Sequence, residues 1–182
     1  MSNSSSKRRP VNLSLLVLIL LCLAFPFTAV SCETPMASVD ITYTGWDATF
    51  GGEPTVTGVN QDKDAPRIAE RSAIPAQPLM IVAVLVAVAG LVLLSRSKAG
   101  HWLAVGVGAA VAFFLIVGQV SLQDALVSAA TENNEFKGGT AEEMVESRFG
   151  FWATVLLAVT VAAYNAIGLV RRSRTTPAPP SS

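Results

Sequence analysis

The sequence predicts an all-α membrane protein with four transmembrane helices, both termini in the cytoplasm, and a small β-hairpin-like segment outside the membrane between the first two helices. Composition, uncharged runs and the placement of basic residues support this prediction. Of the 182 residues, 51% are hydrophobic and 14% are charged, and the mean hydropathy is +0.49. About a quarter of the residues in a globular protein are usually charged. The composition therefore favours a membrane protein over a soluble domain.

Four stretches contain no Asp, Glu, Lys or Arg: residues 11–32, 72–95, 99–123 and 149–170. A bilayer core about 30 Å thick requires roughly 20 apolar residues in a helix. A charged side chain at the centre of such a helix costs about 2.5–3.5 kcal/mol on insertion scales. We therefore predict spans over residues 11–31, 79–95, 101–120 and 149–170.

The basic residues that flank these spans predict the orientation. Residues 1–10, 96–100 and 171–182 hold Lys7, Arg8, Arg9, Arg96, Lys98, Arg171, Arg172 and Arg174 but no acidic residue. All 13 acidic residues lie in the other two gaps, 32–78 and 121–148. Because Lys and Arg near helix ends mark the cytoplasmic side, both termini are predicted inside. We expect a multi-pass protein of the cell membrane whose two acidic segments are extracytoplasmic.

Three interpretations of the first segment remain open, and they differ at Cys32. Its basic start, apolar run and small residues Ala29 and Ser31 are also typical of a cleavable signal peptide. The residues AVSC resemble a degenerate lipobox, which implies lipidation of Cys32. The apolar run is longer than the 7–15 residues usual in signal peptides, which favours a retained helix. Cys32 lies outside the membrane in all three cases, either as a free thiol or lipidated.

The first outer segment predicts a small β unit. Apolar Val39, Ile41 and Tyr43 alternate with polar residues, and a Gly51-Gly52 turn precedes residues 55–57. Three aromatic residues of this segment are candidates for contact with a partner: Tyr43, Trp46 and Phe50. In the second outer segment, Thr140 and Glu143 form a capping-box pattern, which predicts that the fourth helix begins above the membrane at Thr140.

No sequence motif indicates catalysis, a cofactor or a metal site. Asn60, Asp62 and Asp64 imitate the start of a calcium loop, but Ala65 and Arg71 occupy the positions that need Gly and Glu. His101 is the single histidine and has no neighbouring ligand types. We therefore expect no catalytic residue, no cofactor and no metal.

Small residues recur at helical spacing in three of the predicted spans and indicate close helix packing. Ala83 and Ala87 share one face of the second span, and longer rows in the third and fourth spans supply the helix-packing candidates. These helix-packing candidates are Ala104, Gly108, Ala112, Ala158, Ala162 and Ala166. The spans hold no ionisable residue at depth, which disfavours a proton relay or an ion path within one chain. Gln119, Thr154, Thr160, Tyr164 and Asn165 are their main polar residues, and such residues commonly form hydrogen bonds between helices.

The FPFTAVSC junction followed by TYTGWDATFGG, about residues 25–52, resembles a pattern in small bacterial four-helix membrane proteins. In these proteins a Pro-aromatic-x-x-Val-Ser-Cys exit from the first helix precedes a short Thr-Gly-aromatic segment. The resemblance implies a bacterial origin and the same orientation. No activity is attached to the pattern, so the resemblance transfers no catalytic residue.

The leading functional hypothesis is a non-enzymatic accessory or scaffold subunit whose outer segments contact a protein partner. Besides the lipid bilayer, the expected partner is therefore another protein or a second copy, and not nucleic acid, because the net charge is zero. One alternative is a small transporter or channel component that acts as an oligomer. Another is an envelope protein lipidated at Cys32. A thiol-based enzyme acting through Cys32 is a further hypothesis.

Overall fold

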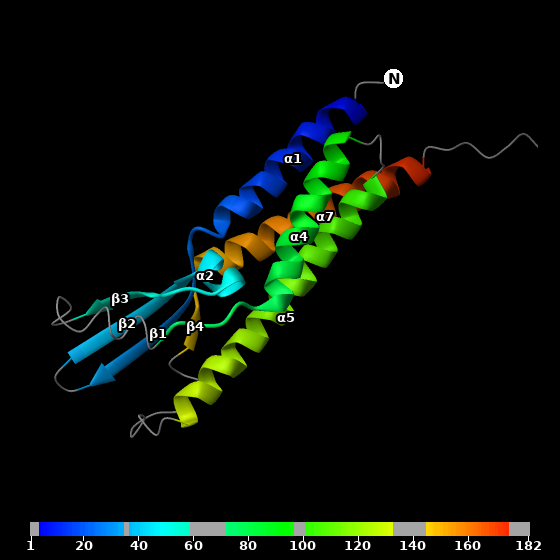
Figure 1. Cartoon of the computed structure of the whole chain (residues 1–182). Coiled ribbons are helices and arrows are strands. Elements are labelled where there is room, and N and C mark those ends of the chain that lie inside the picture. Colours follow the sequence, from blue (N-terminus) through cyan, green and yellow to red (C-terminus); the bar gives the residue numbers. More distant parts are fainter. Residues whose placement is uncertain (1–3, 35–36, 59–71, 97–100, 133–144, 175–182) are drawn as a thin grey trace, which may run out of the picture.

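The computed structural model describes residues 4–34, 37–58, 72–96, 101–132 and 145–174. Four long helices form an elongated bundle, and a four-stranded sheet extends from one end of it (Figure 1). In chain order the elements are α1 (Ser4–Cys22), β1 (Pro26–Thr34), β2 (Ala37–Thr44), α2 (Gly45–Phe50), β3 (Thr55–Gly58), α4 (Pro78–Arg96), α5 (His101–Glu132), β4 (Val145–Ser147) and α7 (Phe149–Arg174).

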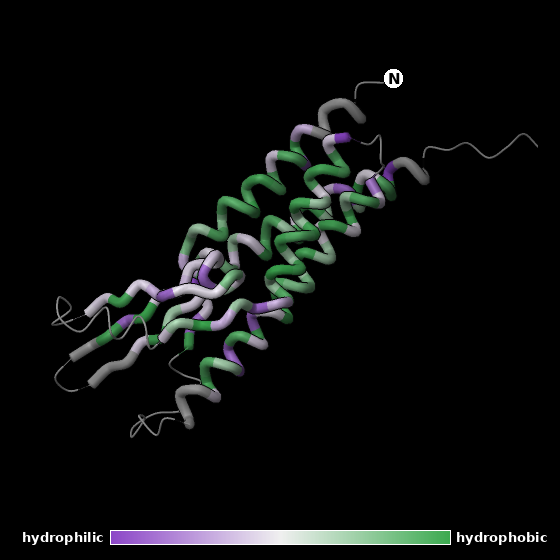
Figure 2. The backbone as a smooth tube through the Cα atoms, viewed as in Figure 1, coloured by the Kyte–Doolittle hydropathy of each residue, from purple (hydrophilic) through white to green (hydrophobic). Residues whose placement is uncertain are grey.

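Within the described part of the chain, three helices are long and apolar enough to cross a membrane: Pro78–Arg96, His101–Ser128 and Phe149–Arg171. The apolar part of α1, Pro10–Cys22, is shorter. The protein is thus mostly helical, with three candidate membrane-spanning helices and a small sheet. Figure 2 shows hydrophobic residues along the middle of the bundle and polar residues toward both ends.

The four long helices form a closed ring in which α1 and α5 each pack against both α4 and α7. Residues from all four helices form the shared core, among them Leu16, Ala87, Leu115 and Ala158, each at most 2% exposed. The start of α1 and the end of α7 lie at the same end of the bundle, opposite the sheet (Figure 1). Each of these helices therefore runs the length of the bundle.

The sheet has the strand order β3-β2-β1-β4, and every neighbouring pair is antiparallel. The predicted pairing of the segment around Ile41 with residues 55–57 is confirmed, because Ile41 lies opposite Val56. The connection between β2 and β3 is longer than a tight turn and contains α2. This helix begins at a capping box formed by Thr44 and Asp47. Gly51 has a φ of 79°, a backbone conformation that favours glycine, and it ends α2.

The prediction of a helix over residues 11–31 is wrong at its outer end. Helix α1 ends at Cys22, and residues 26–34 form β1, the strand that pairs with both β2 and β4. Pro26 cannot donate a backbone hydrogen bond, and it disfavours helical backbone at the preceding residue. Phe27, Thr28 and Ala29 are completely buried in the strand. A run without charged residues is compatible with a buried strand as well as with a helix. The uncharged run over residues 11–32 therefore does not show where the helix ends and the strand begins.

Two boundaries near the second outer segment also differ from the prediction. Helix α5 continues past residue 120 to Glu132, because Leu122 packs with Met80 and Ala48 in a small cluster next to the sheet. Residues 145–147 form β4, and α7 begins at Phe149, so no single helix runs through this segment. The predicted cap at Thr140 lies outside the described residues.

Close backbone contacts join the sheet to the bundle. A Cβ on Gly150 would lie 2.5 Å from the carbonyl oxygen of Pro26, so only glycine fits at this point. The Arg148 amide donates to the carbonyl of Phe27 at 2.7 Å, and the rings of Phe27 and Phe151 meet edge to face with centroids 6.0 Å apart. The sheet is therefore fixed to the ends of α1 and α7.

Candidate functional site

The strand register gives the sheet one apolar face. Val145, Val30, Ile41 and Val56 lie opposite one another across the four strands, and all are half-buried. Residues paired across antiparallel strands share a face. Thr28 shares this face and bonds to Gln119 of α5. The apolar face is therefore the one directed toward α5.

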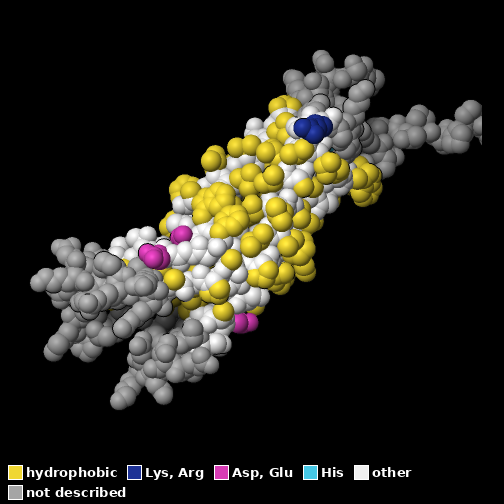
Figure 3. Space-filling view, viewed as in Figure 1, with side chains coloured by type: hydrophobic (Ala, Val, Ile, Leu, Met, Phe, Trp, Pro, Cys, Tyr) yellow, Lys and Arg dark blue, Asp and Glu magenta, His cyan; other side chains and the backbone are white. Residues whose placement is uncertain are grey.

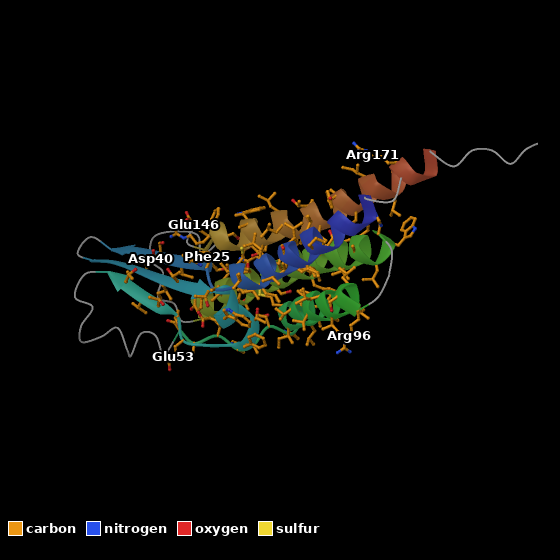
Figure 4. All side chains as sticks on the ribbon, turned by 90° about the horizontal axis from the view of Figure 1, so that it is seen from above. Phe25, Asp40, Glu53, Arg96, Glu146 and Arg171 are labelled. Carbon is orange, nitrogen blue, oxygen red and sulfur yellow. The ribbon has the colours of Figure 1, made fainter. Side chains whose placement is uncertain are left out.

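The opposite face of the sheet is polar, and we call it the polar face. Its polar residues are Ser31, Asp40, Thr42, Thr55, Thr57, Glu146 and Arg148, all of them exposed or half-buried, and the completely buried Ala29 lies between Thr42 and Glu146 on the same face. Asp40 lies at its centre: one carboxylate oxygen accepts from the Ser31 hydroxyl at 3.2 Å, and the other lies 3.6 Å from Arg148. Arg148 also lies 3.9 Å from Glu146. Figure 4 shows Asp40 and Glu146 at the sheet end, and Arg96 and Arg171 at the other.

A hydrogen-bonded network connects the sheet to α5 where the two meet. The amide nitrogen of Gln119 donates to the Thr28 hydroxyl at 2.8 Å and to the Ser147 hydroxyl at 3.2 Å. Gln123 donates to the same Ser147 oxygen at 3.1 Å. Gln119 is 3% exposed, and its carbonyl oxygen has no hydrogen-bond partner among the described residues. The network holds β1 and β4 in a fixed position against α5.

A second polar contact lies inside the bundle, between α1 and α7. The side-chain amides of Asn12 and Asn165 exchange hydrogen bonds of 3.0 and 2.9 Å, and Asn165 also donates to the carbonyl of Val161 at 2.8 Å. Both residues are at most 5% exposed. Asn165 was recognised from the sequence as a polar residue in a span, but its partner Asn12 was missed. The sequence does distinguish Asn12, because it is a polar residue within the first uncharged run.

We expect Asn165→Leu to destabilise the folded protein by about 1–2 kcal/mol, because it leaves the Asn12 amide buried without a partner. Asn12→Leu should have a similar effect. The double variant should be more stable than the sum of the two single effects predicts, because it leaves neither amide unpaired. Unfolding in a denaturing detergent measures all three variants. If the two single effects on the free energy of unfolding simply added in the double variant, this result would contradict a stabilising interaction between Asn12 and Asn165.

The helix-packing candidates lie on α5 and α7, two helices that pack against each other. Ala104, Ala112 and Ala158 are buried, whereas Ala162 and Ala166 are half-buried. Gly108 is buried, and a Cβ on it would lie 2.8 Å from both the Ala158 carbonyl oxygen and the Ala162 amide nitrogen. The backbones of α5 and α7 therefore approach each other closely at Gly108, within a single chain.

Two of the three aromatic contact candidates are accessible. Trp46 and Phe50 are 42% and 50% exposed, and their rings stack with centroids 5.3 Å apart. Tyr43, by contrast, is 2% exposed, and its hydroxyl donates to the carbonyl of Ser72 at 2.7 Å. Burial raises the pKa of Tyr43 to about 12, so it remains a neutral donor at physiological pH. The expected contact between Tyr43 and a partner is not supported, because the Tyr43 side chain is buried on the apolar face of the sheet.

The remaining candidates contribute no assembled site. Cys32 lies in β1 opposite Val39, and its side chain is outside the described residues, as are Asn60, Asp62 and Asp64. Cys22 is a buried free cysteine. Within the described ranges, no group of three or more His, Cys, Asp or Glu residues could hold a metal ion.

A small apolar cavity lies among the described residues of the four long helices. It measures about 10 Å³ and is lined by residues of all four long helices, including Ile19, Ala87, Leu115 and Thr154. The Thr154 hydroxyl donates to the carbonyl of Gly150 at 2.7 Å, so it is not directed at a ligand. A cavity of this size holds about one water at most.

Comparison with known proteins gives no match, either to a protein-family model or to a curated protein. The resemblance in residues 25–52 therefore remains a prediction. The structure adds that this segment contains β1, β2 and α2, the elements that join the sheet to the helices.

Proposed function

We propose that this protein is a non-enzymatic accessory or scaffold subunit of the cell membrane, which presents the polar face of its sheet to a protein partner outside the cytoplasm. The observation that carries this proposal is the rigid attachment of an exposed polar face to the helix bundle. Gly150, Phe27 and Gln119 fix the sheet at its junction with α1, α5 and α7. A surface held in this way is preorganised for binding.

The proposed placement has four crossings, with both termini in the cytoplasm. The apolar part of α1 is short, but α1 packs along α4 and α7, and its start lies beside the end of α7 (Figure 1). Arg96 and Arg171 lie at the end opposite the sheet (Figure 4). Because basic residues mark the cytoplasmic side, these positions support an external sheet.

The first segment is retained in this proposal. Cleavage before Cys32 would remove α1 and the part of β1 that pairs with β4. It would also leave Asn165 and Gln119 without their partners Asn12 and Thr28. Lipidation at Cys32 requires the same cleavage, so the packing of residues 4–31 counts against both the lipoprotein and the cleaved-signal interpretations.

A transporter is supported less well. The interior cavity is too small for a substrate, and both amide groups of the Asn12–Asn165 pair are engaged with each other. An oligomeric transporter would instead place its pathway between copies of the chain. Solute flux into liposomes that is lost in Asn165→Leu, while that variant remains folded, would favour an oligomeric transporter.

Site-specific photo-crosslinking in intact cells tests the proposed function. A photoreactive amino acid replaces Thr57, which is exposed on the polar face, and in a control it replaces Leu85, which is 60% exposed on α4. We expect Thr57 to yield a discrete protein adduct and Leu85 to yield none. The adduct should weaken in Asp40→Lys, which reverses the charge at the centre of the face. Protein that forms no adduct at Thr57 and purifies without a partner in mild detergent would overturn the proposal.

A further inference from the structure

Helix α2 carries two large aromatic side chains on one surface. Trp46 and Phe50 are separated by one helical turn, and their rings stack at 5.3 Å with an interplanar angle of 17°. They are 42% and 50% exposed, although both are mostly apolar. We call these two rings the aromatic pair. Two adjacent exposed rings on a short helix form a contact surface that needs a partner.

The position of the aromatic pair is fixed, because α2 is held across the outer ends of α1 and α4. The Trp46 amide donates to the carbonyl of Leu23 at 3.1 Å, and the Gln77 amide donates to the carbonyl of Thr49 at 3.2 Å. Gly45 is so close to the residue that follows α1 that a Cβ on Gly45 would lie 2.8 Å from the Cα of Leu23. The opposite side of α2 is therefore buried, and the aromatic pair points away from the protein.

The aromatic pair continues the apolar outer surface of the bundle. Gly45 bonds to the carbonyl of Phe25, whose side chain is 51% exposed at the end of α1. Phe25 lies where the sheet meets the helices (Figure 4). At the start of α7, Phe149 and Trp152 are 77% and 56% exposed. In Figure 3 hydrophobic side chains cover the helices between a basic end and an acidic sheet end. Exposed aromatic residues of α2, the start of α7 and the segment after α1 thus lie near the junction of the sheet with the bundle.

The level of this junction matches one edge of a bilayer. Helix α4 begins next to α2 and has 19 residues, which corresponds to about 28 Å, close to the hydrocarbon thickness of about 30 Å. Trp102, 76% exposed, lies at the start of α5, beyond the opposite end of this span. Trp and other aromatic side chains are enriched at both membrane–water interfaces.

We propose that the aromatic pair of α2 inserts into the outer leaflet, at the boundary between the lipid headgroups and the acyl chains. This inference rests on the proposed membrane placement. It adds that α2 binds lipid next to the sheet, whereas the protein partner binds on the polar face. The Asp47 carboxylate accepts from the Thr44 amide and hydroxyl at 3.0 and 2.7 Å, so the polar groups at the start of α2 are paired with each other. The inserted aromatic pair sets the height of the sheet above the bilayer.

Depth-dependent fluorescence quenching tests this proposal. The full-length chain with Trp102→Phe and Trp152→Phe retains Trp46 as its single tryptophan, and it is reconstituted into phosphatidylcholine vesicles. We expect lipids brominated near the headgroup to quench Trp46 several-fold more strongly than lipids brominated near the chain end. Aqueous iodide should quench it only weakly.

A matched protein that retains only Trp152 is the control. If Trp152 is quenched by brominated lipid and Trp46 is quenched by iodide alone, the lipid contact is wrong while the membrane placement stands. If neither tryptophan responds to brominated lipid, the membrane placement itself is wrong. Trp46 that is shielded from iodide but insensitive to every brominated lipid would identify a protein contact, either with a partner or with a second copy, and would also overturn the proposal.

Discussion

Gly108→Leu should prevent stable packing of α5 against α7 and cost at least about 3 kcal/mol of folding free energy. The first added carbon would already lie 2.8 Å from backbone atoms of Ala158 and Ala162 and 3.2 Å from the Cβ of Val161. Backbone atoms in a helix cannot turn aside as a flexible side chain can, so the helices must separate. Size-exclusion chromatography in mild detergent should show aggregated or absent protein.

Gly106→Leu is a matched control for this substitution, on the same helix. A Cβ on Gly106 meets no atom within 4 Å, and the residue is exposed. Because Leu has a higher helix propensity than Gly by somewhat under 1 kcal/mol, this variant should be folded and at least as stable as the parent chain. If Gly106→Leu and Gly108→Leu gave the same elution profile in mild detergent, this result would contradict the close approach of the two helices at Gly108.

The second large effect is expected from removal of the first segment. A chain that starts at Cys32 should not fold, because it lacks α1 and the completely buried residues Phe27, Thr28 and Ala29. Strand β4 would lose its pairing, since it is bonded to residues 28–30 of β1. Detergent extraction followed by size-exclusion chromatography measures this loss.

The mass of the purified full-length protein tests the same point without a truncation. We expect it to include residues 4–31. The matched variant Cys32→Ser, which cannot be lipidated, should retain the same segment and remain folded. A purified protein that begins at Cys32, with or without a diacylglycerol adduct, would show that the first segment is not part of the folded protein.

The three candidate membrane-spanning helices could be predicted from composition, because length and hydropathy are local properties of the sequence. An uncharged apolar run of about 20 residues favours a helix in lipid whatever the rest of the chain does. Pro78–Arg96, His101–Ser128 and Phe149–Arg171 follow this rule. The strands near Ile41 and Val56 were also predictable, since alternation of apolar and polar residues is a local pattern.

The polar face of the sheet could not be predicted from the sequence, because it is formed by contacts between segments that lie far apart in the chain. Asp40 and Arg148 meet because β1 pairs with β2 on one side and with β4 on the other. No property of the sequence near Asp40 indicates this. Tyr43 looked like an exposed contact residue, yet its hydroxyl is bonded to Ser72 and its ring is buried. Exposure is a property of the assembled fold, and alternation in one strand does not reveal what covers each face.

By itself, the sequence determined that the chain contains long apolar helices, how its charges divide between the segments that flank them, and that a short β unit follows the first apolar run. Tertiary structure alone decided that this run changes from helix to strand after Cys22, and that Asn12 pairs with Asn165. The physical reason is that an apolar run without charges satisfies both a lipid-facing helix and a buried strand. Only the available partners, Thr44 through Ala37 on one side and Val145 through Ser147 on the other, make the strand more favourable.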